Sequence, residues 1–124
     1  MVQRFWNVIQ DSATYNTWKG TYYMRRGTTP TYTIYIDDIA ELEQQDIYVT
    51  IKQDNTEIVK HGADLTVDAN SVQFALSQEE TLSLHHGYAD VQMRGIKNGF
   101  AWATDMAVLP IEPILQDAVI PLTI

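Results

Sequence analysis

The 124-residue sequence contains no cysteine, so neither disulfides nor thiolate metal sites are available to it. No apolar run approaches the ~18 residues of a membrane-spanning helix, and the first residues lack the apolar core and cleavage site of a signal peptide. Basic residues are few: the sequence has eight basic and sixteen acidic residues, which give a formal net charge of −8. Such a surface repels polyphosphate. We therefore expect a soluble protein made in the cytoplasm, with neither nucleic acid nor a membrane as its partner.

Motifs of known catalytic chemistry are also missing. No serine lies in a nucleophile elbow, and no glycine-rich loop fits a phosphate or a dinucleotide. His85-His86 and His61 lack metal-ligand spacing; we assign the pair to a helix C-terminus, where a partly protonated imidazole is favourable, and His61 to a turn. We predict no enzyme, no metal and no cofactor. Turn and cap roles are expected for the carboxylate pairs Asp37-Asp38, Asp64 with Asp68, and Glu79-Glu80.

Period-two alternation of apolar and polar residues is the dominant pattern and indicates strands. The clearest case is Asp46–Gln53, which is followed by the turn signal Asp54-Asn55 and by Thr56–Lys60 as the returning partner. Further strands are expected at Tyr22–Arg26, Thr31–Ile36, Leu65–Val67 and Val72–Leu76.

Asn98-Gly99 is the strongest short hairpin signal in the chain. It predicts two long strands, Tyr88–Lys97 and Phe100–Leu109. In the second strand, alternation is expected to place Met106 and Val108 on the same face as Trp102.

One short helix interrupts the strands. Ser77 and Glu80 form a capping box, which predicts a helix from Gln78 to about His85. Several short strands at near-regular spacing predict an all-β domain, an antiparallel β-sandwich of Ig-like or jelly-roll-like type, with this one capped helix and extended terminal arms.

Both ends of the chain carry apolar residues outside the regular alternation. We divide the chain into an N-terminal arm (1–20), a β-sandwich domain (21–110) and a C-terminal tail (111–124). Apolar arms must be buried, either over the sheet edges of their own domain or on a neighbouring subunit. We favour the first for the N-terminal arm and leave both open for the tail. The candidate assembly contacts are Phe5, Trp6, Trp18, Ile111, Ile114, Leu115, Val119, Ile120 and Leu122.

Aromatic residues allow a second kind of function, because several on one sandwich face would stack against sugars. We favour core, ordinary strand and subunit-contact roles for them and keep glycan binding as the alternative function. The residues concerned are Trp18, Tyr22, Tyr23, Tyr32, Tyr35, Tyr48, Tyr88 and Trp102.

An ordered series of turns and strands resembles small tail- or baseplate-associated proteins of phages and prophages of Gram-positive bacteria. It is similar in outline to the N-terminal β-sandwich module of phage upper baseplate proteins. The likeness covers about residues 24–120, and Met1–Tyr23 departs from it. The elements that carry it are Arg26-Gly27-Thr28-Thr29-Pro30, Thr31–Ile36, Asp46–Gln53, Glu57-Ile58-Val59-Lys60, Leu76–Leu82, Ala89–Arg94, Ala103-Thr104-Asp105 and the Ile-Leu-x-Asp-x-Val-Ile run at 114–120.

The resemblance implies a structural protein of the virion that is repeated in a symmetric assembly. Its partners would be other virion proteins or further copies of itself, in a homo-oligomer. The terminal arms would then form the contacts between subunits.

Overall fold

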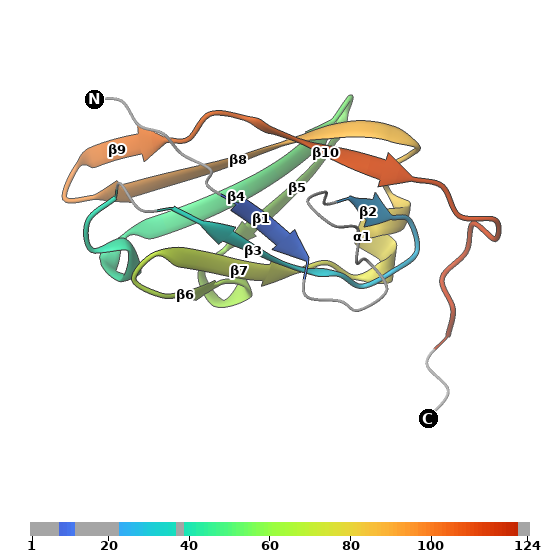
Figure 1. Cartoon of the computed structure of the whole chain (residues 1–124), viewed down its shortest axis with the longest axis horizontal. Coiled ribbons are helices and arrows are strands. Elements are labelled where there is room, and N and C mark those ends of the chain that lie inside the picture. Colours follow the sequence, from blue (N-terminus) through green and yellow to red (C-terminus); the bar gives the residue numbers. More distant parts are fainter. Residues whose placement is uncertain (1–7, 12–22, 37–38, 122–124) are drawn as a thin grey trace.

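The computed structural model describes residues 8–11, 23–36 and 39–121, and for residues 8–11 only the backbone (Figure 1). The described part is mostly β, with one short α-helix, as predicted. None of the helices in the described part has the length and apolar character of a membrane-spanning segment. The elements are β1 (Val8–Asp11), β2 (Met24–Arg25), β3 (Thr31–Tyr35), η1 (Leu42–Gln44), β4 (Asp46–Gln53), β5 (Thr56–His61), η2 (Gly62–Asp64), β6 (Thr66–Val67), β7 (Ser71–Ala75), α1 (Gln78–Leu82), β8 (Gly87–Lys97), β9 (Phe100–Ala103) and β10 (Ala107–Glu112).

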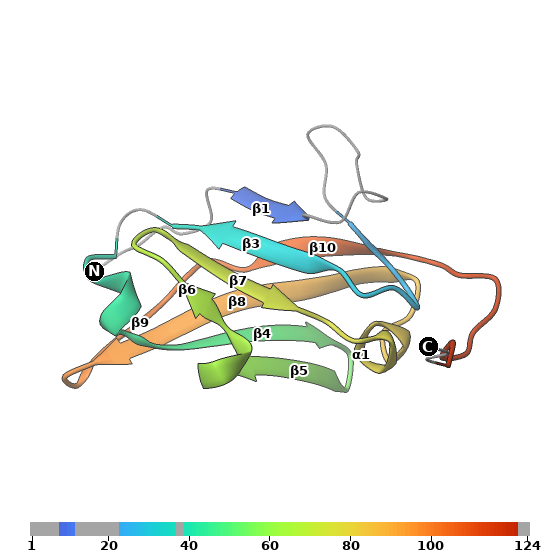
Figure 2. The same ribbon diagram turned by 90° about the horizontal axis from the view of Figure 1, so that it is seen from below.

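The strands form two sheets (Figure 2). The larger has six strands in the order β2-β10-β8-β4-β5, with β9 also paired to β8, and it curls into a half-barrel. The smaller has the order β1-β3-β7-β6 and is antiparallel throughout. In the larger sheet β2 runs parallel to β10. The prediction of a purely antiparallel sandwich is therefore corrected, because the larger sheet is mixed.

The two sheets share one hydrophobic core, to which the alternating residues of each contribute. From the small sheet, Tyr32, Ile34 and Phe74 are buried; from the large sheet, Val49 and Met93 meet them. Complete burial of one such side chain contributes about 1.5–3 kcal/mol, so the period-two pattern fixes which face of each strand lies inward.

The second predicted hairpin forms at Asn98-Gly99, but its returning strand is interrupted. Ala103 pairs with Arg94 and Ala107 pairs with Val91, so two residues of β8 lie opposite the three residues 104–106. One extra residue on one strand is a β-bulge.

Buried Thr104 holds this bulge in place. Its N–H donates to the carbonyl of Met93 at 2.9 Å, and its hydroxyl accepts from the N–H of Met93 at 3.1 Å. The side-chain amide of Gln92 donates to the Thr104 carbonyl at 2.8 Å. The polar groups freed by the interrupted ladder are thus satisfied locally.

The bulge reverses which side chains point inward. Trp102 is buried before it, whereas after it Leu109 and Ile111 are buried and Met106 and Val108 are exposed. The prediction that Met106 and Val108 share the face of Trp102 was wrong, because one inserted residue shifts a period of two by half a cycle.

The capping box at the start of α1 is confirmed. The N–H of Glu80 donates to the Ser77 hydroxyl at 3.1 Å, and the Glu80 carboxylate accepts from the N–H of Ser77 at 2.9 Å. The helix ends at Leu82, three residues earlier than predicted, so the two histidines at 85 and 86 lie in the turn before β8.

Gly95 of β8 provides a test of the core beside this hairpin. A Cβ at Gly95 would lie 2.5 Å from Cε2 of Trp102, whose indole N–H donates to the side chain of Gln45 at 3.0 Å. Alanine restricts the unfolded chain and so favours folding by about 0.4–1 kcal/mol. Overpacking costs about 1–3 kcal/mol, so we expect Gly95→Ala to lower the free energy of unfolding in urea titrations.

A Trp102→Leu background is the matched control. There Gly95→Ala should cost clearly less, because the ring that it would strike is absent. Equal costs in both backgrounds would show that the indole is not the obstacle.

Candidate functional site

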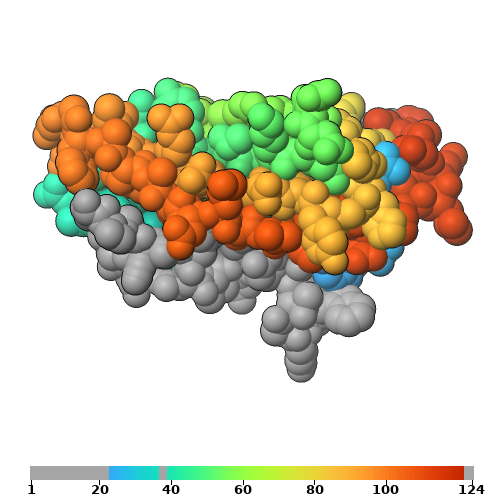
Figure 3. Space-filling model, turned by 90° about the horizontal axis from the view of Figure 1, so that it is seen from above, coloured from blue at the N-terminus to red at the C-terminus, as the bar shows by residue number. Residues whose placement is uncertain are grey.

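Residues 113–121, here called the tail segment, leave β10 and run along the end of the molecule formed by α1 and the turn after β2 (Figures 1 and 3). Three sets of hydrogen bonds fasten this segment, from Arg25, Arg26 and Gln78. Each comes from an element that the fold places at this end.

Arg26 is the centre of these contacts. Its Nε donates to the carbonyl of Leu84 at 2.5 Å and its Nη2 donates to the carbonyl of Leu82 at 2.8 Å. The same guanidinium reaches the Asp117 carboxylate, with Nη2 at 3.0 Å and Nη1 at 3.2 Å. Charge-assisted bonds in this forked geometry are the stronger kind of hydrogen bond, and only an arginine supplies all four donors at once.

Gln78 grips the backbone of the tail segment. Its side-chain oxygen accepts from the N–H of Ile120 at 2.7 Å, and its side-chain nitrogen donates to the carbonyl of Ile120 at 3.1 Å. Farther back, Nη1 of Arg25 donates to the carbonyl of Pro113 at 2.8 Å. These bonds are made to backbone atoms, so they do not depend on the side chain at position 120.

The apolar side chains of the tail segment are buried only slightly by this docking. Leu115 is 105% exposed, Ile120 64% and Val119 42%. Ile114 alone turns toward the domain, where its Cγ1 lies 3.8 Å from the position of a Cβ on Gly27. Exposed apolar residues gathered on one segment mark a contact surface more often than isolated ones do.

An open hollow of about 420 Å³ and another of about 630 Å³ are the two concavities relevant here. The larger lies between the tail segment and the domain. Its lining comes from the turn after β2, the start of α1 and the last described residues of the tail: Gly27, Thr28, Thr29, Ser77, Gln78, Glu79, Val119, Ile120 and Pro121.

The predicted assembly contacts differ in their exposure to solvent. Ile111 lies in β10 and is 1% exposed, so it belongs to the core of the domain and not to an arm. Ile114 is half-buried, and Leu115, Val119 and Ile120 are exposed. Four further contacts lie outside the described residues: Phe5, Trp6, Trp18 and Leu122.

Of the N-terminal arm, the backbone of β1 is described, and it pairs with β3 at the edge of the small sheet. This stretch adds a strand to the edge of the small sheet beside β3.

Sequence reasoning missed both anchors, Arg26 and Gln78. Their partners lie 91 and 42 residues farther along the chain. No local pattern connects positions so far apart, and Arg26 in the sequence is simply a basic residue before a turn glycine.

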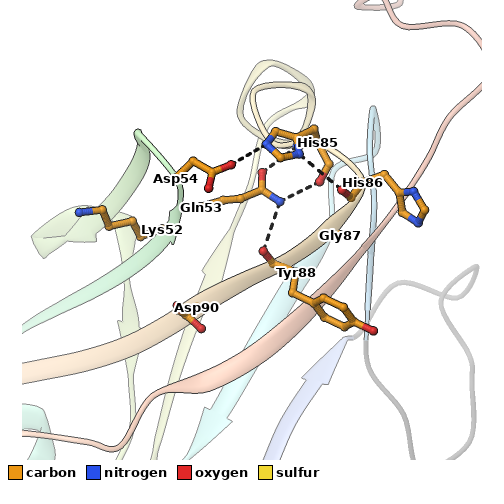
Figure 4. Close-up of a pocket in the computed structure, with 8 residues that line it drawn as sticks. All are labelled: Lys52, Gln53, Asp54, His85, His86, Gly87, Tyr88 and Asp90. Carbon is orange, nitrogen blue, oxygen red and sulfur yellow. Dashed lines mark hydrogen bonds and ion pairs between the residues drawn. The ribbon is translucent and has the colours of Figure 1, made fainter.

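The second hollow lies at the turn between β4 and β5, beside the histidine pair (Figure 4). His85 Nε2 lies 3.0 Å from the Asp54 carboxylate, so His85 is placed by this partner and not by a helix terminus as we had assigned it. Buried Gln53 accepts from the N–H of His85 and donates to the carbonyls of His85 and Tyr88. These bonds satisfy the amide, which therefore positions the turn.

The predicted aromatic platform is not assembled as one surface. Tyr23, Tyr32 and Trp102 are buried, Tyr35 is half-buried, and Trp18 and Tyr22 lie outside the described residues. Tyr88 is 69% exposed, and Tyr48 is stacked on His61 with ring centroids 3.9 Å apart. Tyr48 pairs with Arg94, six residues from Tyr88 on the same strand face, so the backbone positions of the two tyrosines lie about 20 Å apart along the strand.

Of the carboxylates in the predicted pairs, Asp64 acts in a turn and Glu80 in a helix cap. Asp64 accepts from the N–H of His61 at 3.2 Å, and Glu80 completes the helix cap; Asp37-Asp38 lies outside the described residues. Within the part of the chain that is described, no three histidine or acidic side chains are grouped to hold a metal ion.

Neither the protein-family models nor the curated proteins with which the sequence was compared gave a match.

Glu80 supplies a pH-dependent contribution to stability at this end of the molecule. Burial raises its pKa, but both carboxylate oxygens accept from Lys60 Nζ at 2.9 Å and one accepts from the Ser77 N–H, so the net pKa lies below the usual 4.5. A carboxyl with a depressed folded-state pKa stabilises the fold above 4.5, and this contribution disappears as the pH falls through the folded-state value.

We therefore expect the Glu80 contribution to the urea midpoint of the wild type to stay constant from pH 7 to about 4.5 and to be lost as the pH is lowered below 4.5. Glu80→Gln should lower the midpoint at pH 7 and flatten its dependence on pH. Glu79→Gln, at the exposed neighbouring position, is the control and should keep the wild-type slope. If both variants titrate alike, Glu80 is not the source of the effect.

Proposed function

We propose that this chain is a non-enzymatic structural protein of a phage virion, in the tail, the baseplate or another component, that acts through protein–protein assembly. It would be found in the virion after synthesis in the host cytoplasm. The observation that carries the proposal is the tail segment, which is fastened by polar groups while Leu115, Val119 and Ile120 remain exposed.

Exposed aliphatic side chains favour association, because full burial of each contributes about 1.5–3 kcal/mol. The resemblance of residues 24–120 to phage tail and baseplate proteins is consistent with such a role. We also propose the β-sandwich of Ig-like or jelly-roll-like type as the closest description of the fold. Its support is the core shared by the two sheets, although the curl and the parallel pair depart from that type.

Self-association can be measured by light scattering over a concentration series. We expect a discrete oligomer whose mass does not depend on concentration. The triple variant Leu115→Ser, Val119→Ser and Ile120→Ser should shift it toward the monomer, because it removes the apolar surface but retains the backbone bonds between Gln78 and Ile120.

A matched control replaces two exposed apolar residues elsewhere, Phe100→Ser and Met106→Ser. It should leave the mass unchanged. A wild-type monomer at every concentration would contradict self-assembly, and loss of the oligomer in the control alone would move the interface to β9 and the bulge before β10.

Glycan binding is the second candidate, and the smaller hollow favours it. Tyr88 is 69% exposed at this hollow, Asp90 lies two residues along β8 on the same strand face, and Lys52 lies across the strand pair from Asp90; the Tyr88 ring points away from the histidine pair (Figure 4). An exposed aromatic ring with a carboxylate and an ammonium group on the same sheet face is suited to a sugar, which offers an apolar ring face and hydroxyl groups.

A glycan array probed with the wild type tests this function. Any glycan that binds should lose about 1 kcal/mol or more of binding free energy with Tyr88→Ala, because the stacking surface is removed. Phe100→Ala is the control, because Phe100 is a similarly exposed aromatic residue in β9, opposite the far end of β8. No binding above background, or equal losses in both variants, would remove the glycan as a ligand.

A further inference from the structure

The place where the tail segment docks has the chemistry of a socket for a peptide. We propose that it is a contact between subunits, in which the socket of one copy takes residues 117–121 of a second copy. The socket is formed by Arg26, the turn residues Gly27–Thr29 and the start of α1, Ser77–Glu79. This inference rests on the proposed function and names the surface through which assembly would occur.

The socket recognises its occupant with few groups. Arg26 binds one carboxylate, that of Asp117, and Gln78 binds one peptide unit, at Ile120. All donors and acceptors on the socket side belong to the folded domain. The occupant needs only an acidic residue followed three residues later by a peptide unit whose N–H and carbonyl are both free to bond Gln78, and the tail segment of every copy has both.

The intramolecular arrangement leaves one side of this contact open to water. Arg26 is 14% exposed, but the Asp117 carboxylate is 62% exposed, so solvent screens the ion pair and its contribution is modest. The apolar side chains at 115, 119 and 120 remain in contact with solvent. A tail from a neighbouring copy would make the same polar bonds, and close contact between the copies would bury these side chains as well.

The distribution of charge also favours this region as the contact between copies. The chain carries a formal charge of −8, so two copies repel one another over most of their surfaces. Arg25 and Arg26 are two of its eight basic residues, and both face the tail segment, which carries Asp117. Glu79 also lines the socket, so the attraction depends on the two arginines.

The length of the connection restricts the geometry. From Glu112, the last residue of β10, to Asp117 the chain can span at most about 18 Å. A neighbouring socket must therefore lie close to the first. Neighbouring copies would meet at the end of the molecule where the tail segment leaves the body (Figure 3).

Because the chain has no cysteine, single introduced thiols can report the exchange. One protein carries Glu79→Cys in the socket, and a second carries Val119→Cys in the tail segment; both positions line the same hollow. The two proteins are mixed and treated with a short bismaleimide. Peptide mass spectrometry then counts links between positions 79 and 119, which can form only between two copies.

We expect the 79–119 link in the mixture to exceed a control pair, Phe100→Cys with Val119→Cys, by about tenfold, because docking raises the local concentration of the two thiols. Adding Gln78→Ala to the socket protein should return the link to the level of the control pair. Circular dichroism on this variant checks that the domain remains folded.

Two outcomes overturn the exchange, and they differ in what they imply for the proposed function. A single chain that carries both Glu79→Cys and Val119→Cys reports docking of the tail segment on its own domain. If light scattering shows an oligomer but the 79–119 link forms only within this doubly substituted chain, the tail docks on its own domain and assembly uses another surface. If the protein is a monomer and the mixture stays at the control level, the exchange and self-assembly both fail.

Discussion

The guanidinium of Arg26 is the interaction on which one end of the molecule depends. The last carbonyls of a helix have no partner within it, and Arg26 donates to that of Leu82, the last residue of α1, and to that of Leu84 just beyond it. The side chain is only 14% exposed, so its charge needs a partner, and Asp117 provides it. The arginine that bonds the carbonyls at the end of α1 therefore also determines where the tail segment crosses the domain.

The same region explains why the large sheet is mixed. The chain after β2 must stay beside the end of β10, and the N–H of Arg26 donates to the Glu112 carbonyl at 3.0 Å, extending the parallel pair of β2 and β10. A strand of two residues has little stability of its own. Its position follows from the core contact of Met24, which is fully buried, and from the anchoring of Arg26 immediately after it.

Local chemistry made much of this fold predictable. The two hairpins, the capping box of Ser77 and Glu80 and the inward faces of β3 and β4 follow from turn residues and from a period of two, which act between near neighbours. The bulge at Thr104 was not predictable, because it depends on bonds to Met93 across the sheet. That single insertion moved Ile111 from a predicted arm into the core, so the boundary of the tail was misjudged. Of the candidate site, the exposed Leu115, Val119 and Ile120 were identified, but Arg26 and Gln78 were not.

The two hollows differ in what their surroundings can do. Beside His85, polar groups are engaged with one another: Gln53 is satisfied by backbone atoms and His85 is paired with Asp54, while Tyr88 is exposed. Beside the tail segment, the bonds join the domain to a stretch of chain that has no secondary structure of its own and retains exposed apolar side chains. Bonds of that kind are modest in free energy but specific in geometry. Such a contact can be transferred between identical copies without loss of any bond, and this property connects the docking of the tail segment with the assembly role that we propose for the protein.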